Sequence, residues 1–164
     1  MKGEGSVKIV SGGQTGVDRA ALDVALELGI ECGGWCPAGR AAEDGTIDAR
    51  YPLRETPSAD PAERTGWNVR DSDATLILTS DAPSPGTELA IETARRLGRP
   101  LYTFHAGSPE DVGMFRRWLQ VFRVRTLNVA GPRESEAPGI YAGAWRILTS
   151  LLGGTNEHAA LPPV

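Results

Sequence analysis

The sequence of 164 residues has no apolar run close to the roughly 18 residues of a membrane-spanning helix, and no signal-peptide pattern at its start. It has no excess of basic residues either, because 17 lysines and arginines stand against 21 aspartates and glutamates. Non-specific nucleic-acid binding requires a basic surface, so no nucleic acid is expected as a partner. Because a long apolar run is missing, no membrane is expected as a partner either. We expect a cytoplasmic protein with one domain at 1–152 and a flexible tail at 153–164.

Cysteine and histidine are scarce, with two residues of each. Cys32 and Cys36 would lie roughly 13 Å apart in an extended strand, from a rise of about 3.3 Å per residue, which is too far for a disulfide bond. His105 and His158 are distant from both cysteines in the sequence, so no zinc site is expected and no residue is assigned to a metal.

Activated nucleophiles and the familiar phosphate-loop signatures are also missing. Neither histidine stands beside a serine or cysteine in an activating pattern, and no pair of carboxylates forms a specific acid–base signature. The first glycine turn lacks the Gly-Lys-Ser/Thr of a Walker loop, and its glycines do not fit GxGxxG. We therefore expect a binding protein more than an enzyme, with Glu88 as the acid that would carry any catalysis.

What the sequence does contain is an alternation of short β-prone segments and apolar-periodic helices. Strands are predicted at 6–11, 32–36, 74–79, 100–105 and 125–130, and helices at 16–29, 61–71, 86–98, 109–122 and 137–152. This order predicts a Rossmann-like, three-layer α/β fold with a mainly parallel sheet flanked by helices. Ligand sites in such sheets lie beyond the carboxyl ends of the strands, so the loops that follow strands are the candidates.

The first candidate loop, at 11–16, joins the first strand to the first helix. Its glycines permit a sharp turn and a close approach by a ligand, and a helix N-terminus offers unpaired N–H groups to an anion. A phosphate group is expected here, and the alternative is a tight turn without a ligand. Asp18, in the first helical turn, is expected to bind a ribose-like hydroxyl, a base or Arg19. The residues assigned to the phosphate are Gly12, Gly13, Gln14, Thr15 and Gly16.

Three further segments supply candidates. The loop at 79–88 is expected to bring Ser80, Gly86, Thr87 and Glu88 to the ligand, although Thr87 and Glu88 equally suit the start of a helix. The loop at 128–135 offers Arg133, for a phosphate or as a surface arginine, and Ser135, for the ligand or for capping the last helix. The long, mixed-charge segment 37–60 is expected to be ordered and to face a ligand or a subunit, with Arg40 neutralising ligand charge.

Six blocks of sequence together resemble the family described as molybdenum cofactor carriers. They are SGGQTGVDRAALD (11–23), GWCPAGRAAEDG (34–45), YPLRET (51–56), RTGWNVRDSD (64–73), GTELA (86–90) and LNVAGPRES (127–135), so the resemblance spans about residues 6–152. It implies a Rossmann-like fold related to the lysine-decarboxylase-like group. It also implies that the protein binds the molybdenum cofactor, a phosphorylated pterin whose dithiolene holds the metal. A homo-oligomer, dimer or tetramer, and recipient molybdoenzymes are implied as well.

The wider group includes nucleoside-monophosphate phosphoribohydrolases, whose hallmark is Pro-Gly-Gly-x-Gly-Thr-x-x-Glu. This chain has Pro85-Gly86-Thr87-Glu88 instead, with one glycine and with the glutamate directly after the threonine. That departure favours a carrier that binds and protects its ligand. A phosphoribohydrolase, or a nucleotide-binding sensor of the same fold, is the alternative, and turnover that is lost on replacing Glu88 would identify the hydrolase.

Overall fold

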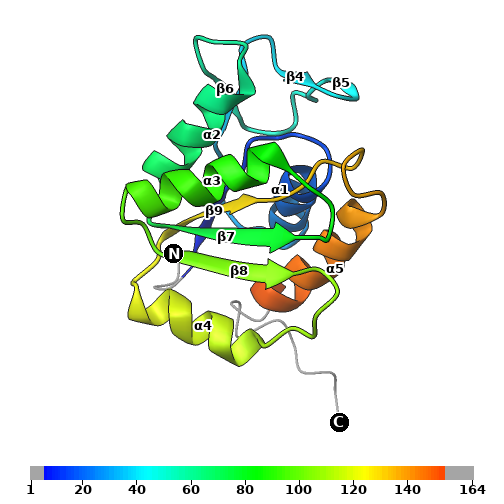
Figure 1. Cartoon of the computed structure of the whole chain (residues 1–164). Coiled ribbons are helices and arrows are strands. Elements are labelled where there is room, and N and C mark those ends of the chain that lie inside the picture. Colours follow the sequence, from blue (N-terminus) through cyan, green and yellow to red (C-terminus); the bar gives the residue numbers. More distant parts are fainter. Residues whose placement is uncertain (1–5, 154–164) are drawn as a thin grey trace.

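A computed structural model describes residues 6–153 and shows a five-stranded sheet with helices on both faces (Figure 1). Every pairing between neighbouring strands of this sheet is parallel. The predicted Rossmann-like α/β fold is confirmed. In the spatial order of the sheet, the strands are β2 (Cys32–Gly33), β1 (Lys8–Val10), β9 (Thr126–Ala130), β7 (Ala74–Thr79) and β8 (Leu101–His105).

The order of the strands is that of a circularly permuted sheet. Numbered along the chain, the five strands lie in the order 2-1-5-3-4. Numbered with β7 as the first strand and β1 after β9, the same sheet reads 2-1-3-4-5, the order of flavodoxin-like doubly wound folds. The strand order then reverses between β7 and β9. Ligands of doubly wound sheets bind at this reversal, so the loops after β7 and β9 lie where a site is expected.

Helices cover the two faces of the sheet in separate groups. α1 (Val17–Glu27) and α4 (Val112–Val121) both pack against α5 (Ile140–Gly153), whereas α2 (Pro61–Arg70) packs against α3 (Pro85–Arg96). Side chains of β7 divide between them, because Leu76 and Leu78 are buried with the first group and Ile77 with the second. Such alternation is expected of a strand that is covered on both faces.

Two helix starts differ from the prediction. α4 begins at Val112 and not at Pro109, because the carboxylate of Asp111 accepts a hydrogen bond from the Met114 N–H at 2.8 Å and caps the helix there. α5 begins at Ile140 and not at residue 137, because Gly139 has a φ of +91°, which an α-helix does not allow. The remaining helices begin and end within two residues of their predicted limits.

The strand predicted at 32–36 is wrong as a single strand, because Gly34 divides it. Gly34 has a φ of +130°, and a Cβ there would lie 2.4 Å from the carbonyl oxygen of Ser11. Only Cys32 and Gly33 pair with β1. After the glycine, β3 (Trp35–Cys36) pairs with β6 (Arg54–Glu55) in a separate two-stranded sheet.

The segment 37–60 is ordered and includes a small hairpin, labelled near the top of Figure 1. β4 (Ala41–Ala42) pairs antiparallel with β5 (Gly45–Thr46), so Glu43 and Asp44 are the two residues at its tip. Behind the hairpin, Ile47, Tyr51 and Leu53 are buried in a cluster with Leu22 of α1. This cluster fixes the segment on the helix that follows the glycine loop.

Within residues 6–153, no helix is both long enough and apolar enough to cross a membrane. The tail expected at 153–164 lies outside the described residues apart from Gly153, which is the last residue of α5. The single-domain organisation at 1–152 stays a prediction.

Candidate ligand-binding site

The glycine loop after β1 makes direct backbone contact with the loop after β9. Gly16 has a φ of +78°, and a Cβ on it would lie 2.3 Å from the carbonyl oxygen of Pro132. The same carbonyl accepts a hydrogen bond from the Val17 N–H at 3.2 Å. Glycine is therefore required at position 16 by both the turn and the close approach of the second loop.

Most of the backbone donors in the glycine loop have partners within the protein, which differs from the unpaired N–H groups expected. The Gly13 N–H donates to Ser11 Oγ at 3.3 Å, and the Gln14 N–H donates to Asp18 Oδ2 at 3.3 Å. The Thr15 N–H donates to the Gln14 side-chain oxygen at 3.2 Å. These polar side chains fold back over the loop, so the Thr15 hydroxyl is the group that it presents outward.

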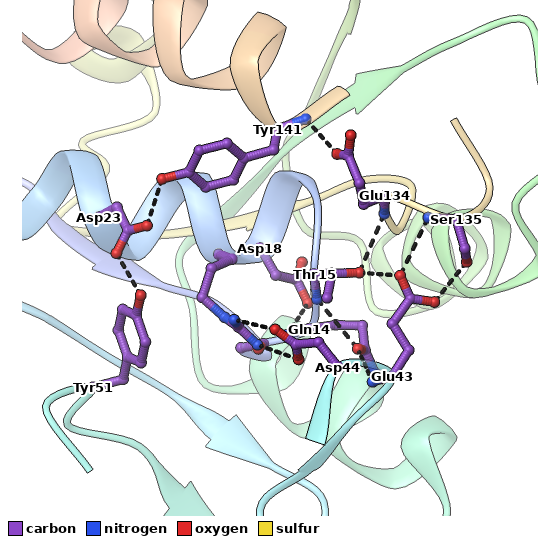
Figure 2. A network of polar contacts seen from close by, with 12 residues as sticks. Gln14, Thr15, Asp18, Asp23, Glu43, Asp44, Tyr51, Glu134, Ser135 and Tyr141 are labelled. Atoms are coloured by element: carbon purple, nitrogen blue, oxygen red, sulfur yellow. Dashed lines mark hydrogen bonds and ion pairs between the residues drawn. The ribbon is translucent and has the colours of Figure 1, made fainter. Parts of the chain in front are cut away.

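Glu43, at the hairpin tip, places its carboxylate among donors from both loops (Figure 2). It accepts hydrogen bonds from the hydroxyl of Thr15, from the Ser135 N–H at 3.2 Å and from Ser135 Oγ at 2.5 Å, and Arg133 Nη1 lies 3.7 Å away. Hydrogen bonds from Ser135 and Thr15 hold the pKa of this carboxyl below its ordinary value. The group formed by Thr15, Arg133 and Ser135 is called the oxyanion cradle below.

Two more carboxylates organise the loop after β9. Glu136 accepts a hydrogen bond from the Arg133 N–H at 2.9 Å and pairs with Arg133 Nε at 3.3 Å. Glu134 accepts from the N–H groups of Gly139 at 2.6 Å and Tyr141 at 2.9 Å, so it is Glu134 and not Ser135 that caps α5. Ser135 is thereby left for the cradle.

Asp18 pairs with Arg64 of α2, and not with Arg19, which was one of the three partners expected for it. The Arg64 Nη1 lies 3.1 Å from Asp18 Oδ2, and their side chains are only 13% and 4% exposed. Burial raises the pKa of Asp18 above its ordinary value, although the charge of Arg64 acts in the opposite direction. Arg19 instead binds the carbonyl oxygen of Gly13 and both oxygens of Asp44, at 3.0–3.2 Å.

Arg40 does not face the cradle residues but holds its own segment together. Its guanidinium donates to four backbone carbonyls, those of Ile47, Asp48, Tyr51 and Leu53, at 2.8–3.1 Å. Arg40 also has a φ of +52°, so its backbone turns back towards these acceptors. The guanidinium of Arg40, which was expected to neutralise ligand charge, is therefore bound by backbone carbonyls of its own segment.

The loop after β7 reaches the cradle through one serine. Ser84 Oγ lies 2.6 Å from Thr87 Oγ1 and 3.3 Å from Glu136, which in turn binds Arg133. Thr87 is buried, whereas Gly86 and Glu88 are exposed in the first turn of α3. Of the four residues predicted in this loop, Thr87 is thus linked to the cradle through hydrogen bonds.

Ser80, the remaining residue predicted in the loop after β7, lines an open depression of about 290 Å³. The depression lies between the ends of β7 and β8 and the start of α5. Asp81 and His105 are also in its wall, with His105 Nε2 lying 2.9 Å from Asp81 Oδ1. His105 Nδ1 accepts from the Gly107 N–H at 3.1 Å, which places the ring proton on Nε2. The depression shares the loop after β9 with the cradle, through Ala137 and its neighbours.

Glu43, Asp44 and Glu136 were not predicted to lie in this region. Glu43 and Asp44 stand in the block at 34–45, directly before a glycine, which was a signal for a turn. Nothing in that signal indicated where the turn would lie, because Glu43 meets Ser135 across 92 residues of chain.

Comparison with known proteins supports the same interpretation of the fold. The chain is similar to a solved structure of a protein from Syntrophus aciditrophicus SB that is named as a proposed molybdenum carrier, with 37% identity and a TM-score of 0.86. The match covers 90% of this chain and 96% of the other. No protein with a curated description matches. Residues 9–152 match the family described as the circularly permutated YpsA SLOG family, in agreement with the strand order. The chain belongs to that circularly permutated YpsA SLOG family.

Proposed function

We propose that this protein is a carrier that binds and protects a phosphorylated pterin, the molybdenum cofactor, at the carboxyl ends of the strands. The observation that carries the proposal is the oxyanion cradle, in which Thr15, Arg133 and Ser135 gather around one carboxylate. All three were predicted as ligand residues from the sequence. Hydroxyl, backbone N–H and guanidinium donors in one place are what a phosphate group requires.

The similarity to a protein named as a proposed molybdenum carrier supports the choice of ligand. The pterin dithiolene would hold the metal, so the protein needs only to bind the organic part and its phosphate. Among residues 6–153, no three histidine, cysteine, aspartate or glutamate side chains form a group that could hold a metal ion. The expected homo-oligomer, the recipient molybdoenzymes and the cytoplasmic location stay predictions.

The test is a thermal-shift and mass-spectrometry measurement of the purified chain with molybdenum cofactor, molybdate and nucleoside monophosphates. A ligand at about a hundred times its Kd stabilises the fold by about 2.7 kcal/mol through mass action. Stabilisation by the cofactor that is lost in Ser135→Ala, but kept in Ser150→Ala on the exposed face of α5, supports the carrier. Stabilisation by a nucleotide, with release of free base that Glu88→Gln abolishes, would replace the carrier with a phosphoribohydrolase.

A further inference from the structure

Glu43 occupies the oxyanion cradle in the manner of a bound anion. Its Oε1 accepts from the Thr15 hydroxyl and the Ser135 N–H, and its Oε2 accepts from Ser135 Oγ and faces Arg133 Nη1. Both carboxylate oxygens are therefore surrounded by donors from other segments of the chain. Figure 2 shows this carboxylate reaching across from the hairpin to the two loops.

The Glu43 carboxylate is not needed to accept hydrogen bonds from the N-terminal N–H groups of α1 and α5. Glu134 already caps α5 through the N–H groups of Gly139 and Tyr141. The Val17 N–H at the start of α1 already donates to the Pro132 carbonyl. The donors that surround Glu43 are thus not required for capping a helix, and they are the same donors that a ligand phosphate would use.

The hairpin is fastened by contacts that do not involve the Glu43 carboxylate. The Glu43 N–H donates to the Gln14 side-chain oxygen at 2.9 Å, and Asp44 pairs with Arg19 at 3.0 Å. The Glu43 side chain is 23% exposed, so its carboxylate borders on water. It can therefore rotate out of the cradle while the hairpin backbone stays in place.

We propose that Glu43 is an internal competitor for the oxyanion cradle, which a tetrahedral dianion displaces in order to bind to Thr15, Arg133 and Ser135. This rests on the proposed function and names the chemical class that the site selects. A tethered carboxylate has a high effective concentration at the cradle, so weakly bound monoanions do not replace it. A phosphate monoester or another tetrahedral dianion brings more charge and more acceptor oxygens than the single carboxylate does.

The test uses calorimetric titration of the full chain with inorganic phosphate, molybdate and phenyl phosphate. Glu43→Gln removes the charge and keeps the shape, so we expect it to bind all three dianions about tenfold more tightly than the unaltered chain does. The matched control is Asp44→Asn, at the same hairpin tip but paired with Arg19, which should change these affinities less than about twofold. Adding Ser135→Ala to Glu43→Gln should abolish the gain.

A folded Glu43→Gln that binds the dianions no more tightly than the unaltered chain overturns the inference. Should that variant fail to fold, the carboxyl carbon resonance of Glu43 in the unaltered chain decides, because saturating phosphate should move it to the position of a solvated carboxylate. An unmoved resonance overturns the inference equally.

Weak cofactor binding together with a tenfold gain in Glu43→Gln would contradict only the proposed function. Tighter binding of phenyl phosphate than of the two inorganic ions assigns the cradle to an ester, and the reverse order assigns it to a free oxyanion.

Discussion

The side chain of Arg64 lies directly over Gly12, so closely that a Cβ at position 12 would stand 2.0 Å from the Arg64 Nη1. The same nitrogen binds the buried carboxylate of Asp18 at 3.1 Å. Glycine at position 12 thus leaves the space in which a buried ion pair joins α2 to α1.

Gly12→Ala is expected to push Arg64 away from Asp18 and to lower the free energy of unfolding by about 3 kcal/mol, since a buried charge loses its partner. The matched control is Gly66→Ala in α2, where a Cβ has no neighbour within 4 Å. That change should raise the free energy of unfolding by up to about 1 kcal/mol. Urea denaturation measures both, and an equal effect of the two substitutions would contradict the role of Arg64.

The loss of unfolding free energy at acid pH should depend on Glu43 and Asp44, at the tip of the hairpin. Hydrogen bonds from Ser135 lower the pKa of Glu43, and a hydrogen bond from Arg19 lowers the pKa of Asp44. An acid whose pKa is lower in the folded chain stabilises the fold above its ordinary pKa, and this contribution is lost as the pH falls through the lowered value. The double variant Glu43→Gln, Asp44→Asn should therefore lose less stability than the unaltered chain between about pH 5 and about pH 2.

Chemical denaturation at a series of pH values measures this difference. Ser150→Ala, on the exposed face of α5, is the control, because it removes no titratable group and should leave the slope of stability against pH unchanged. Parallel profiles for the unaltered chain and the double variant would count against the lowered pKa values.

Arg40→Lys is expected to loosen segment 37–60, because an ammonium group cannot reach four carbonyls that a guanidinium spans. We expect a loss of about 2 kcal/mol in unfolding free energy, from hydrogen bonds to a charged group, and faster proteolysis within the segment. Arg117→Lys on the exposed face of α4 serves as the control. Unchanged proteolysis of Arg40→Lys would show that the buried Tyr51 and Leu53 hold the segment without it.

Asp23 of α1 joins the segment 37–60 to α5, because it accepts hydrogen bonds of 2.6 Å from the hydroxyls of both Tyr51 and Tyr141. Tyr141→Phe should lower the free energy of unfolding by about 1.5 kcal/mol, the usual contribution of a hydrogen bond to a charged group. Tyr102→Phe, whose ring packs on Phe115 outside this network, is the control. Equal losses in the two variants, measured by urea denaturation, would remove the contact with Asp23 as the cause.

The sequence predicts the features of this molecule that depend on local interactions, but not those that depend on contacts between distant segments. β7 was predicted at its observed limits, because buried β-branched and leucine side chains between turn residues are a local signal. The division at Gly34 was not predicted, because it depends on the approach of Ser11, which follows β1. The permuted strand order was not predicted either, since alternation of strands and helices is the same in any rotation of the chain.

The candidate site shows the same limit. Thr15, Arg133 and Ser135 were assigned individually because each follows a strand and carries a donor suited to a phosphate. Their common partner, Glu43, was not assigned, because it lies on a hairpin 28 residues from Thr15 in the sequence. Sequence patterns identify groups suited to a ligand, whereas the side chain that those groups bind within the folded chain depends on tertiary packing.

The contact between Gly16 and Pro132 bears on the entropy of ligand exchange. The backbones of the glycine loop and the loop after β9 touch, so these two sides of the site are held together by direct contact. In the proposed exchange, an incoming anion would order little that is not ordered already, and it would free the Glu43 side chain as it enters. The loss of conformational freedom on binding is correspondingly small. A site that exchanges one ordered anion for another in this way can release its ligand without first unfolding any part of the loops that held it.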